Sequence, residues 1–599
     1  MYKKYIGLTG SEIIYNKLLE YGVNMVSLYS GGAIMPLVDK FHHSNNKKIK
    51  YYVHSHEQNC GHSATGYAKT SGMMGVSIVT SGPGLTNIIT PMLDATNDST
   101  PLMVISGQVS REVMGTLAFQ ECPAVDITRP VTKFSYCIET VDEIPYIMDH
   151  AYFIANDKKK GSVHIDLPKC VATNIFTNNF DKKIYELNKI KNNKENKEKK
   201  KNKKNKENKE NKKYKDTKDK DYLLEISNII NKSEKPILVI GQGANGLSDK
   251  LMDFIEKCNI PVATTIHGLG LINQDHNLSL KWLGMHGYAP ANYAIQESDC
   301  ILCIGSRFDD RTTGNVSKYA PKAKNIIHVN IEEGEIRKNI NSNYNIVDTA
   351  KNFLNKINNN MKYKKRDNWI NYINNLKNKY PFEFEKLKNK LNMPMVIKEI
   401  NNQMKNNTII TTGVGTHQMQ TAQFINWKPG MKFISSGSLG VMGVGIPYAI
   451  GAKLAEKYRD VIVIDGDSSA LMTISDLKTI KEYNIPVKIV ILNNNKQGMV
   501  YIWEELFYNN RITATEYNSN PSFTKLANSF GIKSLYCDKP NNLNKIINKF
   551  INYNGPILLE CKVVNDICTP LVTPGGGLDE MIFKKDYLNK ITLKGETPN

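Results

Sequence analysis

Two groups of oxygen-bearing side chains end neighbouring apolar runs in the last third of the chain. Asp465-Gly466-Asp467-Ser468 closes one run, and Asn493-Asn494-Asn495 closes the next. Mg²⁺ prefers oxygen ligands and is commonly held by few protein groups together with substrate phosphates. Asp467 and Asn494 are therefore predicted to bind the metal, and the helix that follows would present its N-terminus to a diphosphate. Either pattern alone would be weak, because both are common in turns.

Taken together, at strand ends and at this spacing, the two groups resemble the thiamine-diphosphate (ThDP) signature. That signature is a Gly-Asp-Gly triplet followed at a similar distance by a pair of Asn. Many relatives carry Gly or Ala where this chain has Ser468. The difference lies near the metal but removes no ligand.

Glu57, in His56-Glu57-Gln58 after the predicted strand 49–53, acquires a role from this resemblance. A lone Glu in a loop is usually just solvated. In the ThDP superfamily, however, a carboxylate bonded to the pyrimidine ring promotes the imino tautomer that deprotonates the thiazolium carbon. A charge-assisted hydrogen bond in a dry pocket suits that task. The glutamate of one subunit reaches cofactor bound by its neighbour, so the resemblance implies at least a dimer.

Short motifs in a fixed order extend the resemblance over nearly the whole chain, one Lys-rich segment excepted. Each motif is a turn that could recur by chance, whereas the ordered set is specific. On this set the chain resembles the acetolactate synthase (acetohydroxyacid synthase) family. The motifs are Tyr29-Ser-Gly-Gly-Ala33, His56-Glu-Gln58, Thr80-Ser-Gly-Pro-Gly-Leu-Thr-Asn87, Gly107-Gln108, Ala118-Phe-Gln-Glu121, Asp166-Leu-Pro-Lys169, Leu283-Gly-Met-His-Gly287, Gly305-Ser-Arg-Phe-Asp-Asp-Arg311, Thr412-Gly-Val-Gly415, Met442-Gly-Val-Gly445 and Gln497-Gly-Met-Val-Tyr-Ile-Trp503.

The resemblance implies catalytic and substrate-binding roles position by position. Glu57 would activate the pyrimidine, and Met442 would be the bulky side chain that keeps the cofactor bent. Met499 would lie close to the reacting centre. Arg311 would pair with the carboxylate of the second substrate, and Trp503 would favour 2-oxobutyrate over pyruvate. The residues expected to face the site from the other subunit are Phe119, Gln120 and Lys169.

The resemblance also implies two cofactor-binding sets, although Val414 and Phe119 would serve equally well as core. The ThDP set comprises Glu57, Pro83, Asn87, Val414, Gly415, Thr416, His417, Gly440, Met442, Gly466, Asp467, Ser468, Asn494 and Met499, with Asp467 and Asn494 as metal ligands. The set for FAD, which would have no redox role, comprises Lys159, Gly241, Gly243, Thr264, Thr265, Ile266, Leu283, Gly284, Met285, His286, Gly305, Ser306, Arg307, Phe308, Asp309, Asn330 and Ile331.

Two positions of the FAD set depart from the family. Lys159 replaces an Arg, and Lys supplies charge without the planar fork of a guanidinium. We therefore expect weaker FAD binding. Asn330 stands where relatives usually carry Asp.

The implied enzyme decarboxylates pyruvate and joins the remaining two-carbon carbanion to a second 2-oxo acid. The product is 2-acetolactate from pyruvate or 2-aceto-2-hydroxybutyrate from 2-oxobutyrate, the first common step of valine, leucine and isoleucine biosynthesis. The nearest rival is a pyruvate oxidase, which shares the domains; the runs 497–503 and 119–120 favour the synthase. A simple decarboxylase is disfavoured, because His42-His43 precedes Glu57, whereas the paired histidines of that group follow it.

Alternating strands and helices must position these residues, which predicts an α/β protein with three doubly wound parallel-sheet domains. Ligands of such sheets lie beyond the carboxyl ends of the strands, where nearly every Gly-rich turn falls. The expected divisions are an N-terminal pyrimidine-binding domain (1–178), a Lys/Asn-rich disordered insert (179–222), a central FAD-binding domain (223–360), a helical connector (361–392), a diphosphate- and Mg-binding domain (393–575) and a C-terminal tail (576–599).

The charge of the chain points away from nucleic acid as the main partner. The formal net charge is +20. Residues 189–221 hold sixteen Lys and seven acidic residues, net +9, which leaves +11 for the rest. That segment has no Arg and no hydrophobic period, so it cannot bury enough apolar surface to fold. The alternative from a different class is a non-enzymatic or nucleic-acid-binding protein that acts through this Lys-rich segment. Deleting residues 189–221 and measuring whether function persists would test it.

Cysteine use and hydropathy indicate an internal compartment. Cys300 and Cys303 form a CxxC, but residues 299–305 are predicted as a buried strand, whose alternation sends the two thiols to opposite faces. No apolar run approaches the ~20 residues of a membrane helix, and residues 1–10 lack a signal core. We expect a non-secreted protein of the plastid stroma or the bacterial cytoplasm.

The expected partners are small 2-oxo acids and further copies of this chain. A homodimer or homotetramer with active sites at the subunit interface follows from the resemblance. The sequence leaves open whether a small regulatory subunit, common in the family, is present. Neither nucleic acid nor a membrane is an expected partner.

Overall fold

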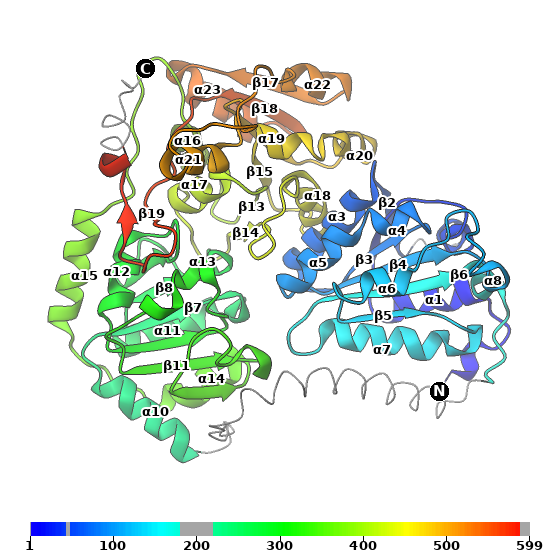
Figure 1. Ribbon diagram of the computed structural model, residues 1–599, viewed down its shortest axis with the longest axis horizontal. Helices are drawn as coiled ribbons and strands as arrows, with labels where there is room; N and C mark the ends of the chain where they lie inside the picture. Colours follow the sequence, from blue (N-terminus) through cyan, green and yellow to red (C-terminus); the bar gives the residue numbers. More distant parts are fainter. Residues whose placement is uncertain (1, 44–47, 180–219, 588–599) are drawn as a thin grey trace.

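The computed structural model describes residues 2–43, 48–179 and 220–587, and they form three α/β domains (Figure 1). Each domain has one six-stranded parallel sheet. This confirms the predicted fold class. The predicted disordered insert lies mostly outside the described residues.

The first domain has the strand order β2-β1-β3-β4-β6-β5. Its strands are β1 (Met25–Leu28), β2 (Lys50–Val53), β3 (Gly75–Val79), β4 (Leu102–Gln108), β5 (Phe134–Cys137) and β6 (Ser162–Pro168). Its helices are α1 (Gly10–Glu20), α2 (Met35–His43), α3 (Glu57–Ser71), α4 (Pro83–Thr86), α5 (Ile89–Asn97), α6 (Ala124–Thr128), α7 (Ile144–Asn156) and α8 (Lys169–Thr173). Strands β3, β4 and β6 are buried along their whole length, as strands covered by helices on both faces must be.

The central domain has the order β12-β11-β10-β7-β8-β9. Its strands are β7 (Pro236–Ile240), β8 (Val262–Thr264), β9 (Ser279–Trp282), β10 (Cys300–Ile304), β11 (Asn325–Asn330) and β12 (Tyr344–Val347). Its helices are α10 (Lys220–Lys232), α11 (Ser248–Cys258), α12 (Ala289–Glu297), α13 (Asp310–Thr313) and α14 (Ala350–Ile357), followed by α15 (Asp367–Lys379) in the connector. Cys300 and Cys303 are buried core residues of β10 without a disulfide, as the strand alternation predicts.

The third domain repeats the order as β14-β13-β15-β16-β18-β17. Its strands are β13 (Ile409–Thr411), β14 (Lys432–Ile434), β15 (Val461–Gly466), β16 (Lys488–Asn493), β17 (Lys533–Cys537) and β18 (Ile557–Lys562). Its helices are α16 (Met393–Gln403), α17 (Thr416–Phe424), α18 (Gly445–Ala455), α19 (Asp467–Leu471), α20 (Leu477–Glu482), α21 (Gly498–Phe507), α22 (Phe523–Ser529) and α23 (Pro540–Ile551).

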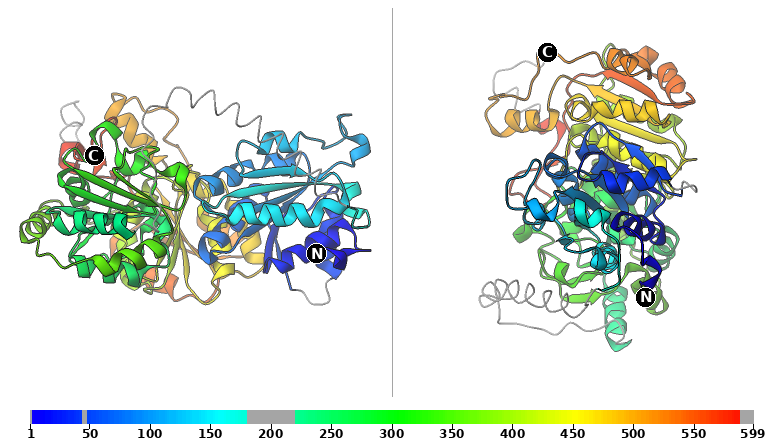
Figure 2. Two further views of the ribbon diagram at one scale, coloured as in Figure 1. Left: turned by 90° about the horizontal axis from the view of Figure 1, so that it is seen from below. Right: turned by 90° about the vertical axis from the view of Figure 1, so that its right-hand side faces the viewer.

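The central domain (green) lies on the left of Figure 1 and the first domain (blue to cyan) on the right. The third domain (yellow to orange) contacts both (Figures 1 and 2). Helices α3 and α18 cross where glycines let their backbones approach. A Cβ on Gly66 would lie 2.5 Å from the Tyr448 carbonyl oxygen, and one on Gly451 would lie 1.9 Å from that of Ser63. This crossing joins the first domain to the third within one chain.

Two segments near the expected boundaries belong to the central domain. Tyr222, assigned from the sequence to the end of the insert, is buried in the core that α10 builds. At the other end, the hairpin of β19 (Leu571–Val572) and β20 (Met581–Ile582) returns from the third domain. Leu578 between these strands is fully buried in the central core. Part of the segment 576–599, predicted as a tail, therefore packs against the central domain, because its apolar side chains cover the central sheet.

Helix α1 begins at Gly10, and Thr9 is its cap. The Thr9 side chain accepts the Glu12 N–H, and the Glu12 carboxylate accepts the Thr9 N–H at 2.8 Å. Thr9 and Glu12 thus form a reciprocal capping box. The Ser11 hydroxyl does not cap the helix and donates to the Ala172 carbonyl instead. Among the described helices none is long and apolar enough to cross a membrane.

Candidate functional site

A cavity lies at the carboxyl ends of the third sheet, where the Asp and Asn motifs meet. Strands β15 and β16 are parallel neighbours, with Gly466 beside Leu492 in the register, so Asp467 and Asn494 leave the sheet at one edge. The cavity is lined by most of the predicted third-domain set, namely Val414, Gly415, Thr416, His417, Met442, Gly466, Asp467, Ser468, Asn494 and Met499. Gly440, also predicted, is not among the lining residues.

The buried Asp467 carboxylate is held by three N–H donors. Its Oδ1 accepts the Ser468 N–H at 2.9 Å, and its Oδ2 accepts the Asn495 N–H at 2.7 Å. The third donor is the Asn520 amide nitrogen, 2.6 Å from Oδ2. Burial raises the pKa of Asp467, and these hydrogen bonds oppose the rise. A bound cation would favour the ionised form further.

The donor set of this cavity fits a hard cation carrying phosphate ligands. Among the described residues no group of three His, Cys, Asp or Glu side chains is placed to hold a metal alone. One carboxylate and one amide oxygen, those of Asp467 and Asn494, are what Mg²⁺ uses when phosphates and water complete its shell. The Asn494 oxygen accepts only one long hydrogen bond, from the Lys496 N–H at 3.3 Å.

Glycine keeps the floor of this cavity open. A Cβ on Gly498, the first residue of α21, would lie 2.8 Å from the Thr416 hydroxyl and 3.3 Å from the Asn494 amide nitrogen. Beside it, His417 Nε2 lies 3.0 Å from Asp465 Oδ1, both side chains being buried. Any larger residue at 498 would fill the space between the metal ligands and α17.

A second group of predicted residues gathers at the carboxyl ends of β3, β4 and β6 in the first domain. Glu57 starts α3 and is 8% exposed, and the Asn87 amide donates to its Oε2 at 3.0 Å. Gly82 has φ +58°, and a Cβ there would lie 3.0 Å from the Gln120 carbonyl oxygen. Only glycine adopts this conformation readily at so close an approach. The turn at Gly82 therefore packs against Gln120, and Asn87, a few residues later, holds Glu57 through a hydrogen bond.

Phe119 and Gln120 lie in the loop 109–122, and Lys169 lies after β6; Phe119 and Lys169 face solvent, whereas Gln120 is half-buried. Phe119 is 88% exposed, Gln120 has φ +64°, and Lys169 is exposed at the start of α8. Among the first-domain residues that the structure describes, none lines the third-domain cavity of the same chain. The two predicted halves of the ThDP site are thus each assembled, but they are separate within one chain.

The predicted FAD residues gather at the strand ends of the central sheet. Gly241 and Gly243 follow β7 and abut Gly305 after β10, where a Cβ on Gly243 would lie 2.7 Å from the Gly305 Cα. Asn330 donates to the Ser306 carbonyl at 3.0 Å. The remaining predicted residues, 264–266, 283–286, 306–309 and 331, follow β8, β9, β10 and β11.

Two predicted basic residues of this set pair with protein groups. The Lys159 ammonium lies 2.6 Å from the buried Glu335 carboxylate and so joins the first domain to the central one. Arg307 donates to the Asn97 carbonyl at 2.7 Å and to the Ser438 hydroxyl at 2.6 Å. Both cations therefore connect domains.

Arg311 and Trp503, predicted to shape the second-substrate pocket, approach one region from different domains. Arg311 lies against the Met285 sulfur at 3.1 Å, and Met285 packs on a cluster that includes Ile502 of α21. Trp503 follows on α21 and packs edge-on against Phe507, with ring centroids 5.1 Å apart. Arg311 keeps 62% of its side chain exposed and is available to a ligand.

Sequence reasoning missed the polar junction where all three domains meet. The buried carboxylate of Asp98 accepts from Lys69 Nζ at 2.6 Å and from the N–H groups of Gly437 and Ser438 at 3.1 and 2.9 Å. His267 of the central domain lies 3.4 Å away. No motif marks Asp98, because its partners come from distant parts of the chain.

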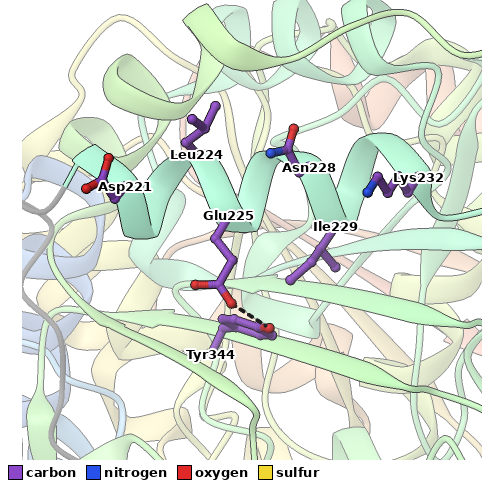
Figure 3. A pocket seen from close by; sticks show the side chains of 7 residues that line it. All are labelled: Asp221, Leu224, Glu225, Asn228, Ile229, Lys232 and Tyr344. Atoms are coloured by element: carbon purple, nitrogen blue, oxygen red, sulfur yellow. Dashed lines mark hydrogen bonds between the residues drawn. The ribbon is translucent and has the colours of Figure 1, made fainter.

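A separate open cavity of about 410 Å³ lies along α10 in the central domain. Figure 3 shows Glu225 and Ile229 pointing from α10 toward Tyr344, while Leu224 projects from the other face of the helix; the Tyr344 hydroxyl donates to Glu225 at 3.1 Å. Tyr344 is the first residue of β12, so this groove lies beside the amino-terminal end of that strand. It holds none of the predicted site residues.

Comparison with known proteins supports the same three-part division. Residues 8–128 match the family described as the N-terminal TPP binding domain of thiamine pyrophosphate enzymes, residues 223–357 the central domain, and residues 413–561 the C-terminal TPP binding domain. The chain is 38% identical to the mitochondrial acetolactate synthase catalytic subunit of Saccharomyces cerevisiae, over 96% of this chain and 84% of that protein. It is 37% identical to the acetolactate synthase large subunit of Lactococcus lactis, over 96% of each chain. It is 36% identical to the chloroplastic acetolactate synthase of Arabidopsis thaliana, over 96% and 85% respectively.

Proposed function

The chain belongs to the acetolactate synthase family of ThDP-dependent enzymes, and from this premise we propose that it makes 2-acetolactate. Pyruvate loses carbon dioxide, and its former carbonyl carbon, one of the two that remain, forms a new bond to the carbonyl carbon of a second pyruvate, whose oxygen takes up a proton. With 2-oxobutyrate as the second substrate the product is 2-aceto-2-hydroxybutyrate. This is the first common step toward valine, leucine and isoleucine.

The third-domain cavity would hold the diphosphate end of ThDP and its Mg²⁺. Asp467 and Asn494 would supply the protein ligands, and the turn 466–469 with Thr416 would surround the phosphates. The bound cofactor would supply the electron sink that makes decarboxylation possible. Met442 lines the same cavity and would keep the rings in the bent form, while Met499 would cover the reacting side and exclude water.

Glu57 of the partner subunit would complete this cavity. Its carboxylate is buried and held by Asn87, yet no first-domain residue reaches the cavity of its own chain. The exposed Phe119, together with Gln120 and Lys169, would enter from the same partner. This supports a homodimer or homotetramer whose active sites lie between subunits.

FAD would occupy the strand ends of the central sheet without a redox role. The close approach of Gly241 and Gly243 to Gly305 leaves backbone accessible to a dinucleotide. Lys159 is already paired with Glu335, so its charge would be less available to the cofactor than that of a free cation. The proposed consequence is weaker FAD binding.

One observation carries the proposal: Asp467 and Asn494 meet at one cavity lined by the residues that the family resemblance names. The test is an assay of the purified enzyme with pyruvate, ThDP, Mg²⁺ and FAD, in which acetolactate, acetyl phosphate, acetaldehyde and peroxide are all measured. Acetolactate as the main product supports the synthase. Acetyl phosphate with peroxide would identify an oxidase instead, and acetaldehyde a decarboxylase.

Trp503→Leu should reduce the preference for 2-oxobutyrate over pyruvate while acetolactate formation persists. Trp503 stands on α21 near Met499 of the cavity, and the substitution removes the wall that would contact the extra methylene. One methylene in an apolar pocket is worth about 1–3 kcal/mol. Competition between the two oxo acids, scored by product ratio, measures the change.

A matched control for that competition is Phe507→Leu, one helical turn further along α21. It removes an aromatic ring that packs on Trp503 but is not a predicted substrate contact. An unchanged product ratio in Trp503→Leu, or an equal change in both variants, would move the specificity pocket elsewhere.

The compartment proposed for this enzyme is the plastid stroma or the bacterial cytoplasm. The composition rich in Lys and Asn supports an AT-rich bacterial or organelle-encoded gene.

A further inference from the structure

The two oxygens of the Asp467 carboxylate are used unequally. Oδ2 accepts two N–H groups, from the Asn495 backbone and from the Asn520 amide, at 2.7 and 2.6 Å. Oδ1 accepts, from the described part of the chain, only the Ser468 N–H. A carboxylate oxygen offers about two lone-pair sites, so Oδ2 is filled and Oδ1 keeps one site for a cation.

Asn520 spans the ends of two strands. Its amide nitrogen lies 3.1 Å from the Asn493 side-chain oxygen and 3.2 Å from that of Asn495, besides its contact with Asp467. Three oxygens around one nitrogen fix the orientation of this amide, because its own oxygen would face only acceptors there. Asn520 thus joins Asp467, after β15, to Asn493 and Asn495 at the end of β16, the two residues that flank Asn494.

Asn520 ends the chain segment that begins with helix α21 and returns to the strand ends. The segment after α21 returns to the strand end, where the Gln497 N–H donates to the Thr515 carbonyl at 2.8 Å and the Tyr517 N–H donates to the Asn495 carbonyl at 2.9 Å. Asn520 lies three residues further on. The segment 495–520, which contains α21 with Met499 and Trp503, is therefore tied to the Asp467 carboxylate at both of its ends, by the Asn495 N–H and the Asn520 amide.

We propose that Asn520 is a positioning residue for the metal: its amide occupies Oδ2 of Asp467 and so turns Oδ1 toward the cation. This rests on the proposed binding of ThDP and Mg²⁺ at the cavity. Asn520 touches neither metal nor substrate in this role; it acts through Asp467. Partners of this kind are worth about 10–100-fold in metal affinity in other metalloproteins.

The test is a Mg²⁺ titration of the full-length, cofactor-depleted enzyme at fixed ThDP, followed by protein fluorescence. Asn520→Ala and Asn520→Leu, the second of similar volume but without the donor, should both raise the Mg²⁺ half-saturation by about 10-fold or more. A packing role would spare Asn520→Leu. The control is Asn518→Ala, an exposed neighbour that does not contact Asp467. FAD content and the melting temperature without ThDP should stay at wild-type values.

The outcomes separate this inference from the proposed function. Asp467→Ala serves as the reference that should abolish Mg²⁺-dependent ThDP binding. If Asp467→Ala loses binding while both Asn520 variants titrate as wild type, the role of Asn520 is wrong and the site stands. If the wild type itself binds no ThDP with Mg²⁺, the proposed function fails. If Asn520→Ala and Asn520→Leu melt early, Asn520→Ser, which keeps one donor, should give an intermediate midpoint; a wild-type midpoint would again overturn the inference.

Discussion

Glu57→Gln is expected to slow exchange of the thiazolium C2 proton by about 10²-fold or more, the usual size of a lost acid–base contribution. Glu57 is buried at the first turn of α3, and its Oε2 accepts from Asn87. Glutamine has the same shape and still offers Asn87 an oxygen, so the fold and the cofactor affinity should survive. It lacks the negative charge that would strengthen a bond to the pyrimidine ring. Proton–deuterium exchange of bound ThDP, followed by NMR, is the measurement.

The control for this charge change is Glu482→Gln, an exposed residue at the end of α20. It removes the same charge from the surface and should leave the exchange rate unchanged. Wild-type exchange in Glu57→Gln would end the assignment of Glu57. Loss of ThDP binding in that variant would instead show that Glu57 supports cofactor affinity more than proton transfer.

Asp98→Ala is expected to destabilise the protein by about 3–5 kcal/mol, the cost of leaving a buried charge without its partner. The Asp98 side chain is fully buried and that of Lys69 is 7% exposed, so water cannot replace the lost contact. The substitution also frees the N–H groups of Gly437 and Ser438, which lead into the segment 440–442 beside the proposed cofactor site. We expect the first transition in urea unfolding to shift and FAD to be released earlier.

The pH dependence of this junction follows from the ionisation of Asp98. Burial raises the pKa of this carboxyl, but Lys69 and His267 outweigh that effect and hold the pKa well below its ordinary value. A depressed carboxyl pKa stabilises the fold above the pKa of the unfolded chain, about 3.9, and this stabilisation is lost as pH falls through the folded value. The difference between wild type and Asp98→Ala should therefore be full at neutral pH and shrink in acid below about pH 4.

An exposed ion pair supplies the control for Asp98→Ala. Asp126 and Arg129 form a pair at 3.4 Å with side chains 74% and 68% exposed. Asp126→Ala should cost about 0–1 kcal/mol. Adding Lys69→Met to Asp98→Ala should recover part of the loss, because the buried ammonium, which then keeps the Ser435 carbonyl but no carboxylate from Asp98, is gone. Equal, small effects of Asp98→Ala and Asp126→Ala would mean that the junction does not hold the domains together.

Much of the framework follows from local sequence alone. The strand Cys300–Ile304 lies within the run 299–305 predicted as a buried strand, because a strand covered on both faces is a continuous apolar run bounded by turn residues. Asp467 and Asn494 could likewise be located as strand-end residues. Parallel strands bring their carboxyl ends to one edge, so two local motifs suffice to predict one shared site.

The partners of the site residues were decided by tertiary packing. Asn520 lies 53 positions from Asp467 along the chain and Lys159 lies 176 from Glu335, and neither pair has a sequence pattern. Asp98 could not be distinguished from any other acidic residue at a helix end until helices α3 and α5 and the segments at 267 and 437 surrounded it. Periodicity and turn chemistry report the local backbone, whereas the contact of two distant side chains depends on how whole domains pack. For that reason the sequence by itself determined the three sheets, the motifs at their edges and the family. The packed structure alone decided that Glu57 is separated from the cavity of its own chain, which charges join the domains, and which oxygen of Asp467 accepts the Asn520 amide.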